Sequence, residues 1–106
     1  MNTQLKKGVL ELCVLSAVKN SESYGYELVE TISRHIEISE GTIYPLLRRL
    51  TNERYFETYL VESTGGPPRK YYRLTAKGEK FRAGLAAEWD RLVDGVSKLL
   101  HQRGSR

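Results

Sequence analysis

The chain of 106 residues is poor in the side chains that build disulfides, metal sites and catalytic centres. Its one cysteine excludes an intrachain disulfide and favours a reducing compartment. His35 and His101 are isolated, and neither metal-ligand spacing nor a nucleophile–base pair occurs, so we expect no catalytic residue, no metal and no cofactor. The apolar stretches are short, and Glu11 interrupts the longest near the N-terminus, which predicts neither a signal peptide nor a membrane span. A cytoplasmic protein is expected.

Basic residues, by contrast, outnumber acidic ones. Lysine and arginine total 17 against 13 aspartates and glutamates, for a formal net charge of +4. This balance suits a polyanionic partner, provided that the positive charge is clustered. The length gives one domain, with no room for a separate catalytic domain.

Three helices are predicted in the first half of the chain. Residues 4–19 are apolar on two sides, which predicts a helix buried in two directions. One stripe is Leu5, Val9 and Leu12, and the other is Leu10, Val14, Ala17 and Val18. Residues 24–35 form the second helix, for which Ser23 is the expected N-cap. Its apolar residues are Leu28, Val29 and Ile32, and Ile36 continues the stripe past a turn.

The third helix carries the buried stripe Ile43, Leu46, Leu47 and Leu50, at i, i+3, i+4, i+7 spacing. Pro45 allows two starting points. A start capped by Ser39 leaves the carbonyl of Gly41 without its helical donor and predicts an irregular turn, whereas a start at Thr42 places the proline in the first turn. We favour the start at Ser39.

Two strands, 58–62 and 70–74, flank the sequence STGGPPR. Proline cannot donate to a strand ladder and glycine favours turns, so we expect both strands to end there and the tip to be flexible.

Thr75 is the expected cap of a last helix that runs to about Leu100. Its apolar residues follow the spacing of a coiled-coil seam: Leu85, Trp89, Leu92, Val96 and Leu99. Two heptads are too few for a free coiled coil, so the seam needs another surface, and the second stripe of the first helix is the candidate. Both helices have more apolar surface than one small monomer covers, which predicts a homodimer.

The fold class is therefore mainly α with a small β-hairpin, in the order α-α-α-β-β-α of a winged helix-turn-helix. Residues 1–74 would form the DNA-binding domain, residues 75–100 the C-terminal dimerisation helix, and residues 101–106 a flexible tail. The segments GVLELCVLSAV, SYGYEL, GTIYPLLRRL and GGPPRKYYRLTAKG resemble the PadR family of bacterial transcriptional regulators, in its short branch with a single C-terminal helix. The resemblance implies a dimeric repressor of a palindromic operator, often released by a small effector.

Double-stranded DNA is accordingly the expected partner, bound by the third helix and the wing. The start of a recognition helix meets base edges, and arginines further along reach phosphates or guanines. Basic residues beside a glycine tip follow the backbone or enter the minor groove. The candidate residues are Lys6, Lys7, Ser39, Thr42, Tyr44, Arg48, Arg49, Gly65, Gly66, Arg69 and Lys70. For each single basic residue the alternative is a solvated surface charge.

The resemblance also implies a pocket for a small aromatic or phenolic effector, because Trp89 matches the tryptophan that flanks flat effectors in multidrug-responsive relatives. Plausible neighbours from the first helix are Val9, Leu12, Cys13 and Ser16. Glu88, Asp90 or Asp94 would attract a cationic effector. The alternative is that Trp89 is an anchor in the dimer core.

Arg54 departs from the family pattern, which has glycine just after the third helix. Either Arg54 accepts a positive φ or the helix ends differently. The competing function for the whole domain is a winged helix that docks on another protein without reading DNA.

Overall fold

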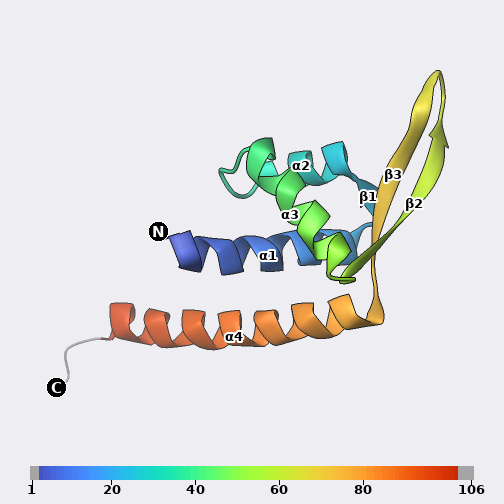
Figure 1. Ribbon diagram of the computed structural model, residues 1–106. Coiled ribbons are helices and arrows are strands. Elements are labelled where there is room, and N and C mark those ends of the chain that lie inside the picture. The colour runs from blue at the N-terminus through green and yellow to red at the C-terminus, as the bar shows by residue number, and fades with distance from the viewer. Residues whose placement is uncertain (1–2, 103–106) are drawn as a thin grey trace.

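Residues 3–102 are described by the computed structural model, with side chains from Lys7 onward; Leu5, Lys6 and residues 103–106 of the expected tail therefore have no described side chain. The elements, drawn in Figure 1, are α1 (Thr3–Asn20), β1 (Ser23–Tyr24), α2 (Gly25–Ser33), α3 (Glu40–Asn52), β2 (Phe56–Ser63), β3 (Gly66–Leu74) and α4 (Ala76–His101). The predicted order is confirmed, with one additional short strand. Within residues 3–102, no helix is long and apolar enough to cross a bilayer.

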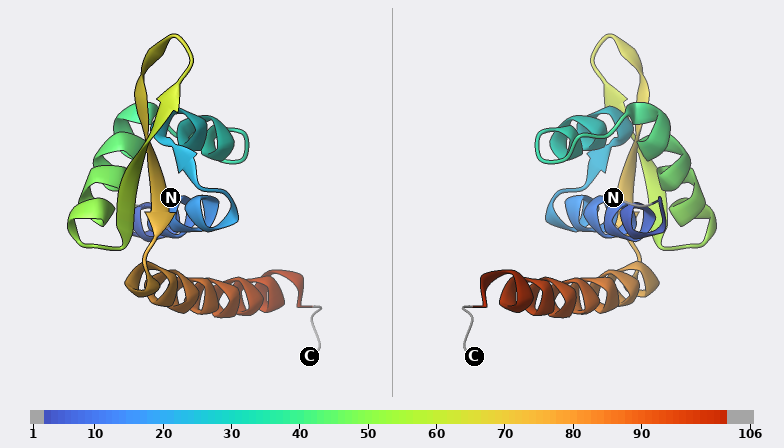
Figure 2. Two further views of the ribbon diagram at one scale, coloured as in Figure 1. Left: turned by 90° about the vertical axis from the view of Figure 1, so that its right-hand side faces the viewer. Right: turned by 90° about the vertical axis from the view of Figure 1, so that its left-hand side faces the viewer.

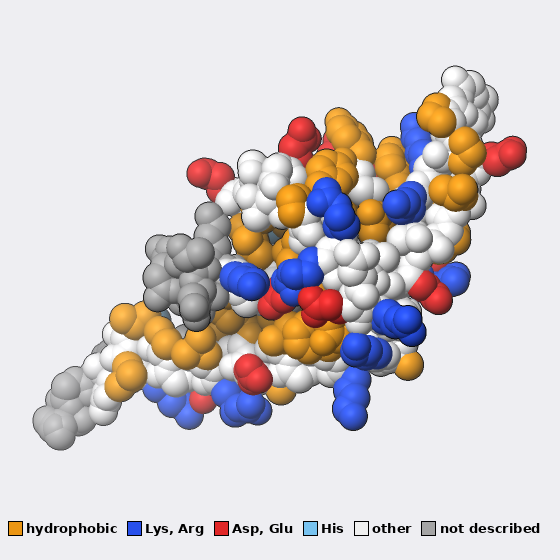
Figure 3. Space-filling view, in the orientation of Figure 1, with side chains coloured by type: hydrophobic (Ala, Val, Ile, Leu, Met, Phe, Trp, Pro, Cys, Tyr) orange, Lys and Arg blue, Asp and Glu red, His pale blue; other side chains and the backbone are white. Residues whose placement is uncertain are grey.

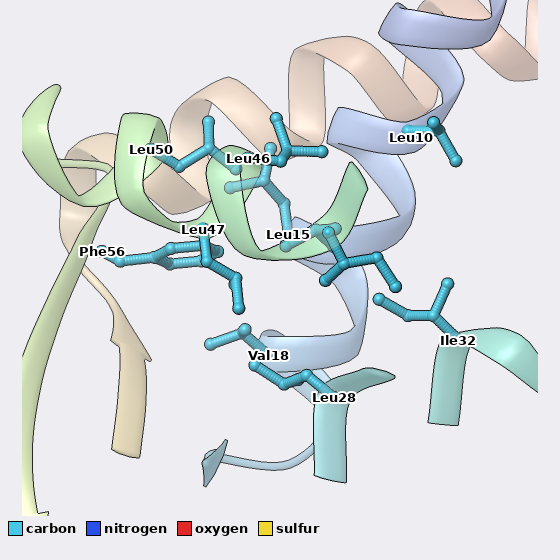
Figure 4. Close-up of a cluster of buried hydrophobic side chains, with 11 residues drawn as sticks. Leu10, Leu15, Val18, Leu28, Ile32, Leu46, Leu47, Leu50 and Phe56 are labelled. Carbon is cyan, nitrogen blue, oxygen red and sulfur yellow. The ribbon is translucent and has the colours of Figure 1, made fainter. Parts of the chain in front are cut away.

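The core lies where α1, α2 and α3 meet the base of the sheet. Val14 and Leu15 of α1, with Ile43, Leu47 and Leu50 of α3, have no exposed surface. Figure 4 shows side chains from these helices and Phe56 converging on one cluster. The stripe predicted for α3 is therefore its buried face, and it orients the opposite face of α3 outward.

The additional strand corrects the assignment of Ser23. The three strands pair antiparallel in the order β1-β3-β2, and Ser23 lies opposite Tyr72 of β3. Ser23 is buried, and its hydroxyl donates to the carbonyl of Ser21, so it is not the N-cap of α2. Tyr24 has that position instead, and its backbone N–H donates to Glu27 Oε1 at 3.4 Å.

The ribbon formed by β2 and β3 is longer than predicted, because its strands do not end at the prolines. The ladder continues past Arg69, opposite Val61, to Gly66, opposite Ser63, with a register shift between them. Two residues remain as the turn, Thr64 and Gly65, and Gly65 has φ +74°. The prolines are tolerated because β1 pairs only with Tyr71 and Tyr72, which leaves the distal part of β3 bonded on one side. The wing is thus a long ribbon with a tight turn, and its tip points away from α4 (Figure 2).

The start of α3 confirms the favoured alternative, since Ser39 has the N-cap position and Pro45 lies inside the helix. The hydroxyl of Ser39 has no capping bond to the backbone; it lies 3.2 Å from that of Thr42. Pro45 is exposed, so water can reach the backbone around the missing helical bond.

Arg54 adopts the positive φ, at 66°, and α3 ends as it would with glycine there. The N–H of Tyr55 donates to Leu50 O at 2.9 Å, and that of Arg54 to Thr51 O at 3.0 Å. These are the two bonds of a Schellman motif, in which glycine usually holds the left-handed position.

Replacing Arg54 by glycine is therefore expected to stabilise the protein. The left-handed conformation costs a non-glycine residue on the order of 1–2 kcal/mol, and the greater freedom of glycine in the unfolded chain offsets part of the gain. We expect a net gain of about 0.5–1 kcal/mol, measured by urea unfolding. The matched control is Asn52→Gly, in the last turn of α3, which should lose stability; a loss in both variants would contradict the argument.

Helix α4 runs antiparallel to α1 along one side of the molecule (Figures 1 and 2). Thr75 caps it as predicted, because its Oγ1 accepts from the N–H of Gly78 at 2.9 Å. Polar contacts join the two helices near the start of α4, where Glu79 binds Lys19 of α1 and Arg82 of α4. The bonds from Arg82 and then Lys19 lower the pKa of Glu79 from 4.5 to about 2.

The stability contribution of Glu79 should consequently depend on pH. A carboxyl with a depressed pKa in the folded state stabilises fully above its unfolded value, and this contribution is lost as pH falls through the folded value. Glu79→Gln should lower Tm at pH 7, and the difference from the wild type should shrink between pH 4.5 and about 2. Glu62→Gln, on the exposed wing, is the control; a difference for Glu79→Gln that stays constant with pH would contradict this prediction.

Candidate nucleic-acid interface

The outward face of α3 lies opposite its buried stripe. With about 100° per residue, Arg48 falls near the centre of this face, and Tyr44 and Arg49 fall on opposite flanks. Ser39, Thr42 and Arg48 are exposed, and Tyr44 is 37% exposed. The helix therefore presents a hydroxyl pair at its start and a guanidinium near its middle.

Tyr44 is held in place by a glycine. A Cβ on Gly25, the first residue of α2, would lie 2.8 Å from Cε1 of Tyr44, so the ring packs directly on the backbone there. A side chain at position 25 would displace the ring. The Tyr44 ring thus lies against the start of α2, and the residue is still 37% exposed.

Arg49 is placed differently from Arg48. Its guanidinium forms ion pairs with Glu11 of α1, at 2.5 Å, and with Glu53, the C-cap residue of α3, at 3.0 Å. The hydrogen bond to Glu11 is the main reason that the pKa of Arg49 is raised. Of the two adjacent arginines predicted to contact DNA, one faces outward and the other is engaged within the protein.

The wing separates its two basic residues in the same way. Neighbouring side chains in a strand point to opposite faces, so Lys70 shares a face with Tyr72, which packs on the core, whereas Arg69 lies on the other face. The guanidinium of Arg69 lies 4.4 Å from the centre of the Tyr24 ring, a cation–π contact. Lys70 therefore lies on the same side of the ribbon as α3.

Tyr72 is a residue that the sequence interpretation missed. It is half-buried, it meets the Phe56 ring edge-on, and burial is the main cause that raises the pKa of its phenol. Tyr44 and Arg48 are close enough to affect that pKa as well. Tyr72 thus joins the outward face of α3 to the wing. The alternation of side chains in RKYYRL was the available signal, since it places Lys70 and Tyr72 together.

The remaining candidates lie apart from this group. Gly65 and Gly66 form the end of the ribbon, and Lys7 is exposed on α1. The side chain of Lys6 lies outside the described residues.

A hollow lies between α1 and α4. Its volume is about 170 Å³, and its lining residues are Gly8, Val9, Leu12, Leu85, Glu88, Trp89 and Leu92. Three predicted effector residues, Val9, Leu12 and Trp89, therefore line one cavity together with Glu88. Cys13 and Ser16 are not among its lining residues, and Asp94 forms an ion pair with Lys98 at 3.0 Å. Burial raises the pKa of the Cys13 thiol, which disfavours the reactive thiolate.

The seam of α4 is largely uncovered from Trp89 to Leu99. Trp89, Leu92 and Val96 are 40%, 47% and 44% exposed, and Leu99 is 77% exposed. Figure 3 shows hydrophobic side chains gathered along α4 on the side that faces α1. In contrast, Leu85 is partly buried against the core.

A three-helix core, a two-stranded wing and an outward-facing third helix define a winged helix-turn-helix. The comparisons specify its family. The model of the transcriptional regulator PadR-like family matches residues 14–84. A crystal structure of a PadR-like transcriptional regulator from Bacillus cereus is 40% identical, with 95% of this chain and 100% of that chain covered and a TM-score of 0.85.

Two further proteins also match over most of this chain. The crystal structure of a Streptococcus transcriptional regulator is 40% identical, covering 94% of this chain and 100% of that one, with a TM-score of 0.84. An uncharacterised protein of Lysinibacillus sphaericus is 30% identical over 93 residues, which cover 84% of this chain and 85% of that protein. The chain belongs to the PadR-like family of transcriptional regulators, as the sequence motifs indicated. It is therefore a regulator of the DNA-binding type and not an enzyme.

Proposed function

We propose that the protein is a dimeric transcriptional repressor that binds a palindromic operator through α3 and the wing. The observation that carries the proposal is the placement of Arg48 on α3 and Lys70 on the wing on one side of the molecule, with Tyr72 close to Arg48 and on the same strand face as Lys70. Duplex DNA presents phosphates on both sides of each groove, which suits a helix in the major groove flanked by a basic ribbon. A bound dimer would repress by covering DNA that the polymerase needs.

The dimer part of the proposal rests on α4. Burial of one leucine side chain is worth roughly 1.5–3 kcal/mol, and Leu92, Val96 and Leu99 remain exposed in one chain. Pairing with a second copy covers this seam, so residues 75–100 serve dimerisation and residues 1–74 serve DNA binding. A two-fold dimer reads two half-sites about 34 Å apart, or a multiple of that distance.

The effector part rests on the cavity at Trp89. An aromatic ring, aliphatic side chains and one carboxylate line it, which suits a flat aromatic or phenolic molecule and favours a cationic one. The alternative role of Trp89, an anchor in the dimer core, uses the same exposed surface.

Binding to duplex DNA at several salt concentrations tests the DNA-binding proposal against a protein-docking module. We expect affinity to fall with salt, with a log–log slope of about −0.9 for each phosphate neutralised. Affinity that is absent, or the same for every duplex at all salt concentrations, would favour the docking module.

For the effector, we expect flat aromatic cations to quench the fluorescence of Trp89, the single tryptophan, and to weaken operator binding. The measurement is a titration of a diverse panel, with Leu92→Ala as a variant that alters the same cavity. If no compound quenches while DNA binding is intact, Trp89 is a dimer-core anchor instead.

A further inference from the structure

Arg49 lies on the flank of α3 that faces α1, and not on the outward face. Its side chain is 36% exposed, and that of its partner Glu11 is 15% exposed. The two residues are 38 positions apart in the sequence, so the ion pair is a tertiary contact. Glu53, the C-cap residue of α3 four positions after Arg49, binds the other terminal nitrogen of the guanidinium. Two carboxylates therefore fix the orientation of one arginine.

The charge of this group does not favour a phosphate. Glu11, Arg49 and Glu53 together carry two negative charges and one positive charge, which leaves a net negative group beside the recognition helix. A DNA phosphate would have to share the guanidinium with both carboxylates, close to their negative charges, or displace one of them. Displacement from Nη2 would leave the poorly exposed Glu11 without its partner. Leaving one member of such a pair alone costs more than the pair itself contributes.

The ion pair connects two functional parts of the molecule. Among the side chains that the structure describes, Lys7 to Gln102, it is the only hydrogen-bonded link between α1 and α3. Glu11 is next to Leu12, and Gly8, Val9 and Leu12 form the α1 wall of the cavity. The apolar contacts of the shared core are not directional, whereas a hydrogen-bonded ion pair defines one register.

We propose that Arg49 is a positioning residue for DNA binding: it fixes the recognition helix α3 on α1 through Glu11, and it does not contact DNA. The inference rests on the proposed function. The two adjacent arginines then have different roles: Arg48 contacts the DNA, and Arg49 holds α3 in the position from which Arg48 can make that contact.

The test is operator affinity as a function of salt for Arg49→Gln, Glu11→Gln and Arg48→Gln. All are measured at a temperature where circular dichroism shows each variant to be folded. Arg49→Gln should bind roughly 5- to 20-fold more weakly with an unchanged salt slope. Glu11→Gln should also bind more weakly, although it removes a negative charge. Arg48→Gln, the matched control, should lower the slope by about 0.9 or lose preference at one guanine.

Three results would overturn the inference. A salt slope lowered by about 0.9 in Arg49→Gln would make Arg49 a phosphate contact. Tighter operator binding by Glu11→Gln would mean that the carboxylate only competes with DNA for Arg49. Unchanged operator affinity in both Arg49→Gln and Glu11→Gln would mean that the ion pair contributes to stability alone. A wild type that binds no duplex would defeat the proposed function and this inference together, whereas the first three results leave the proposed function intact.

Discussion

Of the glycines that the structure describes, Gly78 is the one whose replacement by alanine is expected to destabilise the protein most. A Cβ at this position would lie 2.0 Å from the carbonyl oxygen of Tyr55 and 2.9 Å from its carbonyl carbon. The contact is with backbone, which cannot rotate away, and Gly78 is buried in the first turn of α4. The same oxygen accepts hydrogen bonds from the N–H and hydroxyl of Thr75. A shift of α4 would therefore also break the bonds that join its N-cap residue, Thr75, to Tyr55.

We expect Gly78→Ala to lower the free energy of unfolding by about 3 kcal/mol or more, measured by urea denaturation. The matched control is Gly84→Ala in the same helix, where an added Cβ meets nothing within 4 Å. That variant should gain about 0.5–1 kcal/mol from helix propensity. Equal stability of the two variants would mean that α4 does not approach the end of α3 as closely as described.

The largest functional loss is expected from Arg48→Gln combined with Lys70→Gln. Arg48 lies on the outward face of α3, and Lys70 lies on the side of the wing that faces α3. The double variant therefore removes one proposed DNA contact from each of the two elements. Hydrogen bonds to charged groups contribute about 1.5–3 kcal/mol each, which predicts a loss of affinity of roughly 100-fold or more. If both residues contact phosphates, the salt slope should fall by about 1.8.

The control for this pair is Lys98→Gln. Lys98 also carries a positive charge, but it lies near the end of α4, in an exposed ion pair with Asp94. We expect Lys98→Gln to change the affinity for DNA and the salt slope only slightly. An equal loss from Lys98→Gln would show that net charge, and not the placement of Arg48 and Lys70, determines binding.

Much of the fold followed from local patterns. The buried stripe of α3, the cap at Thr75 and the extent of α1 were predicted, because each depends on residues within a few turns of one another. The positive φ of Arg54 was one of two predicted alternatives. That prediction came from comparing this position with the glycine of the family motif.

The errors involve contacts between distant segments. Ser23 was wrongly predicted to cap α2. Strand β1, which contains Ser23, has only two residues and forms through its pairing with Tyr71 and Tyr72, which are distant in the sequence. The wing was predicted to stop at the prolines because the sequence does not reveal that the distal part of β3 has a single neighbour. Likewise, the sequence could not distinguish Arg48 from Arg49, since the partner of Arg49 is 38 residues away.

The central proposal is that each protomer of a dimer binds one half-site of duplex DNA through α3 and the wing. The most direct measurement is footprinting of the wild type, and of the variant with Arg48→Gln and Lys70→Gln, on the DNA upstream of the protein's own gene. The account predicts two protected half-sites, related by two-fold symmetry and about one helical turn apart, which the variant fails to protect. Protection by the variant equal to that of the wild type would contradict it.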